Sequence, residues 1–214
     1  MIVARTAFAA NWLLMRRLVA GARGKSAAGR EPPAIGQPRF LSLIARLPLE
    51  VAEGLAEAAS GFGQTQPEHY LYPPADIHLT VLGLADLPGL EGQVGVAVAR
   101  HRPFEVEVWG LNVSSDTVFA ELHPRGPGLR ALRGDLRSAE SGEHGSISRW
   151  LRRRLAHANV MRFGAPVDPR LLAEVGRLRA MRFGRFEVDE VELVRTDKVL
   201  SRAGTRTLGQ FRLG

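Results

Sequence analysis

Two short segments of the chain carry a histidine and a second polar residue two positions later. The first holds His78 and Thr80, and the second holds His157 and Asn159. In a β-strand, residues two apart project from the same face, so each pair would lie together while its apolar neighbours enter a core. One histidine on a strand is more often a hydrogen-bonded structural residue. Two such pairs favour acid-base chemistry, because imidazole can accept or donate a proton near neutral pH.

The elements around these pairs repeat along the chain. After His78 a helix begins about twelve residues on, and a strand reading "FEVEV" follows; after His157 a helix begins at Pro169, and a strand with "FEVDEV" follows. Asp168 and Pro169 fit the N-cap and the first position of that helix. The agreement predicts an α+β fold with two lobes of like topology, each with a central strand that carries one histidine.

Hydrophobic periodicity and turn residues place the other elements. The expected strands are 39–46, 77–84, 104–111, 117–122, 157–163, 185–195 and 206–213. The expected helices are 49–60, 90–101, 128–140, 146–155 and the one that begins at Pro169. These elements form one domain, 39–214, which is long enough for a sizeable core.

The N-terminal segment 1–38 is expected to be an amphipathic helix and a linker rich in Gly and Pro. Within residues 1–20, apolar side chains recur at helical spacing, which predicts an amphipathic helix with an apolar stripe of Phe8, Trp12, Met15 and Val19. Asn11 and an arginine pair at 16–17 interrupt the apolar run, so neither a membrane span nor a signal peptide fits, and a cytoplasmic protein is expected. Residues 21–38 are rich in Gly, Ala and Pro, and their "GKS" at 24–26 lacks the rest of a phosphate loop.

Composition and charge limit the classes of protein to which the chain can belong. The 214 residues are 45% hydrophobic and 24% charged, as in soluble globular domains. The absence of cysteine excludes disulfide scaffolds, cysteine-ligated metal centres and thiol nucleophiles. With 29 Lys and Arg against 22 Asp and Glu, the net charge is +7. That charge attracts polyanions such as RNA or nucleotides, although an excess of arginine also accompanies a GC-rich genome.

The two histidine segments resemble a known family. "HLTVLGL" at 78–84 and "HANVMR" at 157–162 are similar to the paired His-x-Thr/Ser motifs of the two-histidine phosphoesterase superfamily, which includes the bacterial RNA 2′,3′-cyclic phosphodiesterases once named 2′-5′ RNA ligases. The resemblance extends over about 39–214, through the lead-in "YPPADIHLT" and the closing pattern "FEVDEVELVRTDKVLS…TLGQFRL". It implies two antiparallel-sheet lobes that face each other across a cleft, with both histidines pointing into it.

The resemblance also implies a reaction. A phosphodiesterase of this kind, which needs no metal, acts on 2′,3′-cyclic phosphate or related RNA and nucleotide ends, with one histidine as base and the other as acid. Thr80 and Asn159 would hold the non-bridging oxygens. Asn159 departs from the family, which usually has Thr or Ser there. An amide can still donate to a phosphate, but the departure keeps a second interpretation open, a nucleotide- or RNA-binding module without turnover.

Other residues are candidates for substrate binding. Tyr70 and Tyr72 precede the first motif, where a ring could stack on a base or pack in the core. Arg162 matches an arginine that often follows the second motif in the family, although strict alternation turns it away from His157. Two arginine clusters could guide a phosphate backbone or form solvated helix faces: Arg149, Arg152, Arg153 and Arg154, and Arg130, Arg133 and Arg137.

The remaining histidines form no metal-binding motif, so structural or surface roles are expected for His69, His101, His123 and His144. The resulting expectation is a monomer with no cofactor, no metal and no membrane span, whose partner is RNA or a nucleotide. A third interpretation makes His78 and His157 buried structural residues of two ordinary sheets. It predicts that the two histidines lie far apart.

Overall fold

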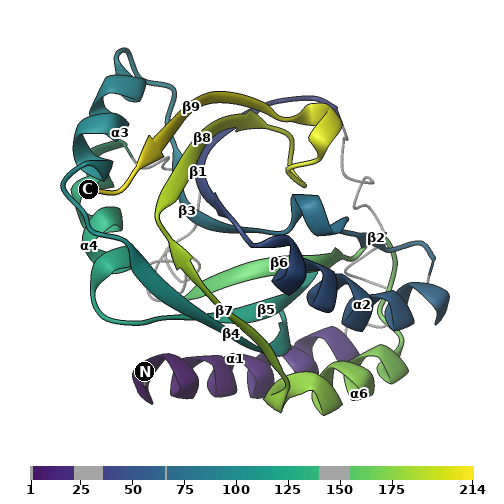
Figure 1. Ribbon diagram of the computed structural model, residues 1–214. Helices are drawn as coiled ribbons and strands as arrows, with labels where there is room; N and C mark the ends of the chain where they lie inside the picture. Colours follow the sequence, from purple (N-terminus) through teal and green to yellow (C-terminus); the bar gives the residue numbers. More distant parts are fainter. Residues whose placement is uncertain (1, 22–35, 66, 140–154) are drawn as a thin grey trace.

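The computed structural model describes residues 2–21, 36–65, 67–139 and 155–214 (Figure 1). Its strands form two antiparallel sheets, sheet A with the order β3-β1-β8-β9 and sheet B with the order β2-β6-β5-β4-β7. Sheet A is curled into a half-barrel, and sheet B lies below it in the view of Figure 1. The fold is α+β and bilobal, as the repeat predicts, but the sheets differ in strand number and order, and the His78 strand β3 is an edge strand of sheet A rather than a central one.

The strands are β1 (Phe40–Arg46), β2 (Tyr70–Leu71), β3 (His78–Leu84), β4 (Phe104–Val113), β5 (Thr117–Pro124), β6 (Ala156–Arg162), β7 (Arg182–Val188), β8 (Glu190–Thr196) and β9 (Arg206–Arg212). The α-helices are α1 (Ile2–Gly21), α2 (Leu49–Thr65), α3 (Leu90–Val98), α4 (Gly128–Asp135) and α6 (Pro169–Arg177). Short 3₁₀ turns are η1 (Pro74–Asp76), η2 (Arg137–Ala139), η3 (Leu178–Ala180) and η4 (Arg202–Gly204).

Most expected elements are confirmed, and the start of α6 follows the predicted capping. The Asp168 side chain accepts a hydrogen bond from the Arg170 backbone N–H at 2.7 Å, and Pro169 takes the first helical position. The single strand expected at 185–195 is wrong. It divides at Asp189 into β7 in sheet B and β8 in sheet A, because the chain crosses from one lobe to the other there.

Other boundaries differ in smaller ways. Helix α3 ends at Val98 rather than at 101, helix α4 ends at Asp135 rather than at 140, and the sequence pattern does not predict β2. The expected helix 146–155 lies outside the described residues except for its last position, and so do His144, the "GKS" segment and the arginines at 149 and 152–154.

One hydrophobic core lies on a single side of both sheets. Leu79 and Val81 of β3 belong to the same buried cluster as Ala156, Ala158 and Val160 of β6. Apolar side chains of α2, α3, α4 and α6 complete this cluster. Because neighbours alternate along a strand, the residues between these apolar positions project to the opposite side of each sheet.

Helix α1, the predicted amphipathic helix, packs on sheet B. Phe8 is fully buried in a small cluster with Phe119 and Leu155. The Asn11 side-chain amide donates to the Asn112 side chain at 3.1 Å and to the Val113 carbonyl at 2.9 Å. Figure 1 shows α1 running beneath β4 and β5. None of the helices in the described ranges is both long and apolar enough to cross a membrane.

Candidate active site

Strands β3 and β6 meet at the junction of the two sheets, where two ties hold them together. At one end, the Arg133 guanidinium donates to the carbonyls of Thr80 at 3.0 Å, Val81 at 2.7 Å and Leu155 at 3.3 Å. At the other end, the Tyr72 backbone N–H donates to the Val160 carbonyl at 3.1 Å. Arg133 therefore joins the two lobes, whereas the sequence placed it on a solvated or phosphate-guiding helix face.

The two predicted histidines lie on the segments that these ties join. His78 lies between Tyr72 and Thr80 along one segment, and His157 lies between Leu155 and Val160 along the other. The two segments run in opposite directions between the ties, so the histidines lie across from each other. Both project away from the shared core, because their apolar neighbours enter it.

His78 is held in one tautomer. Its Nδ1 lies 2.7 Å from the Asp76 carbonyl oxygen, which can only accept, so Nδ1 carries the proton and Nε2 carries the lone pair. The side chain is 6% exposed, and burial lowers its pKa to about 4 against the opposing effect of the Asp76 carbonyl. His78 is therefore neutral at pH 7. Thr80 is partly buried two residues farther along β3, on the same side of the strand.

His157 is partly buried on β6 beside two residues of β5. Its ring meets the Phe119 ring edge-on, with centroids 5.3 Å apart, and its backbone is opposite Glu121 in the strand register. Phe119 in turn contacts Phe8 of α1, with ring centroids 6.2 Å apart. A chain of aromatic contacts therefore connects the N-terminal helix to the second histidine.

Asn159, Tyr72 and Arg162 form one hydrogen-bonded group. The Tyr72 hydroxyl is bonded to the side chains of Asn159 and Arg162, and Arg162 also donates to the Asp116 carboxylate at 2.9 Å. Strict alternation would turn Arg162 away from the side of His157 and Asn159. The β5–β6 register skips Val160, and this bulge restores Arg162 to the side of Asn159.

The two tyrosines differ in exposure. Tyr72 is buried, and burial raises the pKa of its hydroxyl, so the ring supports the site from within. Tyr70 is partly exposed, and burial together with the nearby Asp76 raises its pKa to about 12. The rings are 5.1 Å apart in an edge-to-face arrangement. Stacking of a base on Tyr70 stays a prediction.

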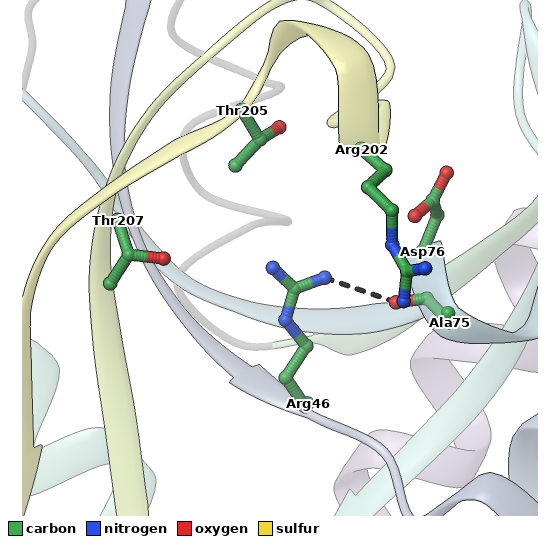
Figure 2. A pocket seen from close by; sticks show the side chains of 6 residues that line it. All are labelled: Arg46, Ala75, Asp76, Arg202, Thr205 and Thr207. Atoms are coloured by element: carbon green, nitrogen blue, oxygen red, sulfur yellow. Dashed lines mark hydrogen bonds between the residues drawn. The ribbon is translucent and has the colours of Figure 1, made fainter.

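A polar cavity of about 360 Å³ lies beside His78 on sheet A (Figure 2). Arg46 is the cross-strand partner of His78, and Asp76 supplies the carbonyl that orients the imidazole. Figure 2 shows the guanidinium groups of Arg46 and Arg202 approaching the cavity from opposite sides. The complete lining is Arg46, Ala75, Asp76, Arg202, Thr205 and Thr207.

The loop that carries Arg202 has a fixed shape. The Asp197 carboxylate accepts the backbone N–H groups of Val199 and Ser201, each at 3.0 Å, and the Ser201 hydroxyl at 2.5 Å. A Cβ at Gly204 would collide with this carboxylate, so glycine is required there. Leu200 has a φ of 57°, a conformation rare for a residue with a side chain, and its side chain packs against sheet A. These contacts set the position of Arg202.

Comparison with known proteins finds likeness at the level of structure. No protein-family model and no curated protein matches the sequence. Among solved structures, TT0787 of Thermus thermophilus is 23% identical, with a TM-score of 0.58, and the match covers 82% of this chain and 98% of that one. E. coli LigT complexed with 3′-AMP is 18% identical, with a TM-score of 0.57, and the match covers 83% and 99%.

E. coli LigT complexed with phosphate is also similar, at 19% identity and a TM-score of 0.55. A further solved structure, described as a phosphoesterase, has 18% identity and the same TM-score of 0.55. The chain has the two-histidine phosphoesterase fold. The matches cover the other chains almost completely. They leave uncovered a part of this chain that is about as long as segment 1–38.

In this phosphoesterase fold, several residues near the histidines have no signal in the sequence motifs. Arg46, Asp76 and Arg202 line the cavity from three elements that are distant in sequence, and only the position of Asp76, two residues before His78, could have pointed to it. The sequence pattern marks Arg133 only as part of a helix face. It predicts helix α1, but the contact of this helix with the second motif strand depends on tertiary packing.

The other described histidines take structural positions. His69 packs against Phe163, and His123 is buried between the rings of Phe8 and Trp109. His101 lies 3.0 Å from the Asp135 carboxylate. Within the described residues, no three His, Asp or Glu side chains are arranged to hold a metal ion.

Proposed function

We propose that the protein is a metal-independent phosphodiesterase that acts on 2′,3′-cyclic phosphate or related RNA and nucleotide ends. The observation that supports this proposal is that the strands carrying His78 and His157 are joined by hydrogen bonds on either side of the histidines, both of which project away from the core. Two imidazoles from different lobes can then act on opposite ends of one phosphoryl transfer.

His78 is the general base in this mechanism. Its Nδ1–H is committed to the Asp76 carbonyl, and its lowered pKa keeps Nε2 unprotonated at neutral pH. Nε2 takes a proton from the attacking water while the water oxygen bonds to phosphorus. His157 gives a proton to the ribose oxygen as its bond to phosphorus breaks. The protons return through solvent, and the product is a phosphomonoester.

Thr80 and Asn159 stabilise the charge on the non-bridging oxygens. Each lies two residues beyond its histidine on the same side of the strand, so we expect the four side chains to face one position at the junction. A hydroxyl and an amide both donate hydrogen bonds, so the replacement of the family's Thr or Ser by Asn159 keeps a donor there.

A second candidate function is binding without turnover. It is favoured by the Tyr72 hydroxyl, which is already bonded to the Asn159 amide. If that bond holds the amide away from the phosphate, the site would bind a nucleotide or RNA end and lack one of its charge-stabilising donors.

Turnover separates the two functions. The protein is incubated, in excess EDTA, with a nucleoside 2′,3′-cyclic phosphate and with a short RNA that ends in one, and the products are identified by chromatography and ³¹P NMR. The proposal predicts a phosphomonoester from both substrates. Binding without product supports the second function, and turnover that requires added metal contradicts the proposed mechanism.

A further inference from the structure

We infer that Arg46 and Arg202, with Thr205 and Thr207, form a site for a second phosphate of the substrate, the 5′-phosphate of the nucleotide whose cyclic phosphate reacts. This inference rests on the proposed function. It names the substrate class as a nucleotide with phosphate at both ends, such as the last nucleotide of an RNA strand.

The first support is the position of the cavity. Arg46 pairs with His78 across β1 and β3, and the two side chains share a face because directly opposed residues of an antiparallel pair do so. Asp76, which also lines the cavity, orients the His78 ring. A ligand whose reacting phosphate lies between the two histidines therefore has its next polar group beside this cavity.

The second support is the supply of hydrogen-bond donors. The Arg202 side chain is exposed, and no hydrogen bond or ion pair of its guanidinium is found in the described part of the chain, so its donors are free for a ligand. Arg46 uses three of its five donors, two at 3.3 Å on the Glu192 carboxylate and one at 3.1 Å on the Ala75 carbonyl. The hydroxyls of Thr205 and Thr207 also line the cavity, where Thr205 is hydrogen-bonded to Thr196 at 2.7 Å and Thr207 donates to the Glu192 carboxylate at 3.4 Å.

Two carboxylates lie near the cavity and do not cancel this charge. Glu192 is held by the Arg46 guanidinium and the Thr207 hydroxyl. Asp76 is 5% exposed, and its carboxylate accepts the Arg202 backbone N–H. Each carboxylate already has a hydrogen-bond partner within the protein. The charge of Arg202 interacts with Asp76 at longer range, and no side-chain hydrogen bond of its guanidinium is found in the described residues.

The third support is the closure of the other half of the site. On sheet B, α1 covers the side that carries His157, with Phe8 seated on Phe119. The remainder of a substrate held between the histidines must therefore extend over sheet A, toward Arg202. The fixed loop at 197–204 holds Arg202 above that route.

Equilibrium binding tests the site apart from turnover. The affinities of a nucleoside 3′-phosphate and of the matching nucleoside 3′,5′-bisphosphate are measured by titration calorimetry for the wild type, Arg202→Gln and Arg206→Gln. We expect the wild type to prefer the bisphosphate by about 10-fold or more, as a charge-assisted hydrogen bond predicts. Arg202→Gln removes the preference, and the control Arg206→Gln, an exposed change outside the cavity lining, keeps it.

The same proteins are then assayed on a nucleoside 2′,3′-cyclic phosphate with a 5′-hydroxyl or a 5′-phosphate. Arg202→Gln should lower kcat/KM for the 5′-phosphate form and leave the 5′-hydroxyl form unchanged. Equal affinity of the wild type for the two ligands, or an equal loss on both in Arg202→Gln, overturns the second site. Absence of turnover with the bisphosphate preference intact contradicts the proposed function and leaves the second site standing.

Discussion

The two lobes differ on the side that carries the histidines. On sheet A, this side is hollow beside His78 and presents Arg46 and Arg202 to a cavity. On sheet B, it is covered by α1, whose Phe8 is fully buried. The difference follows from helix α1, which packs on sheet B. The comparison shows that a helix packed on sheet B can leave the cavity on sheet A as the open side of the histidine-bearing surface.

The covered side of sheet B also differs in chemistry. Buried nitrogen atoms of Trp109, His123 and Arg179 have no hydrogen-bond partner in the part of the chain that the structure describes. An unpartnered buried polar group costs about 1–3 kcal/mol. The burial of Phe8 and the packing of Trp12 against Arg179, 5.0 Å from the indole centroid, offset this cost. Polar and apolar side chains therefore share the surface under α1.

Removal of either histidine should have the largest effect. His78→Ala and His157→Ala should each lower kcat by at least ~100-fold, because each proton transfer contributes ~10²- to 10⁴-fold. Steady-state assays on one cyclic nucleotide measure this loss, with circular dichroism to confirm the fold. His101→Ala, which changes a histidine of α3's C-terminal turn beside Asp135, is the matched control and should stay within a few-fold. Near-normal rates in either site variant would remove that histidine from the mechanism.

Release of α1 should come next. Phe8→Ala deletes a fully buried ring, a change that costs ~3–5 kcal/mol in protein cores, so the amides of α1 should exchange with solvent at least ~100-fold faster. Hydrogen exchange measured by mass spectrometry or NMR detects it. Leu13→Ala, at a side chain 51% exposed on the same helix, should leave exchange unchanged. If both variants behave alike, Phe8 does not hold the helix on sheet B.

Asn159 should have an intermediate effect on turnover. Asn159→Ala removes a donor to the phosphate, worth roughly 1.5–3 kcal/mol, so ~10- to 150-fold in rate should be lost. Asn159→Thr restores the family's hydroxyl and should preserve or raise the rate. In a protein that only binds, the same change to Thr would create turnover, and the change to Ala would weaken binding.

Tyr72→Phe completes this series, because it removes the hydroxyl that is bonded to Asn159 and leaves the buried ring. A higher rate in Tyr72→Phe would mean that this bond holds the amide away from the phosphate. Equal rates and affinities for the wild type and both Asn159 variants would show that Asn159 does not touch the phosphate.

The smallest effect is on stability as a function of pH. His78 has a pKa of about 4 in the folded protein and about 6.5 when unfolded, so between these values the unfolded chain binds a proton that the folded chain does not. The free energy of unfolding should therefore fall as the pH drops from 6.5 to 4, by at most ~1.4 kcal/mol per pH unit from this group. Urea unfolding of the wild type and His78→Gln measures it. An identical pH dependence in both proteins would mean that the pKa of His78 is not lowered.

The sequence predicts the local features of the site and misses those set by packing. The alternation of side chains along a strand places His78 with Thr80 and His157 with Asn159. This alternation can be deduced from the sequence of a single strand. The bulge at Val160 reverses the side of Arg162, because it depends on the register with β5. The register depends on how two strands pair, which the sequence of one strand does not determine.

The crossing at Asp189 illustrates the same limit on the fold. Apolar alternation continues through 185–195, so the pattern cannot mark where the chain leaves sheet B for sheet A. Arg133 has the charge and the helical spacing of a solvent-exposed helix residue, yet its guanidinium reaches three backbone carbonyls because α4 packs against β3. Both features depend on contacts between elements far apart in sequence.

A crystal structure with inorganic phosphate bound tests most directly whether two histidines from different lobes act on one phosphorus. The account predicts one phosphate that contacts both His78 and His157, with the two imidazoles within about 10 Å of each other, as acid and base at hydrogen-bond reach require. Imidazoles farther apart than that in a closed structure, or a phosphate that contacts only one of them, would contradict it.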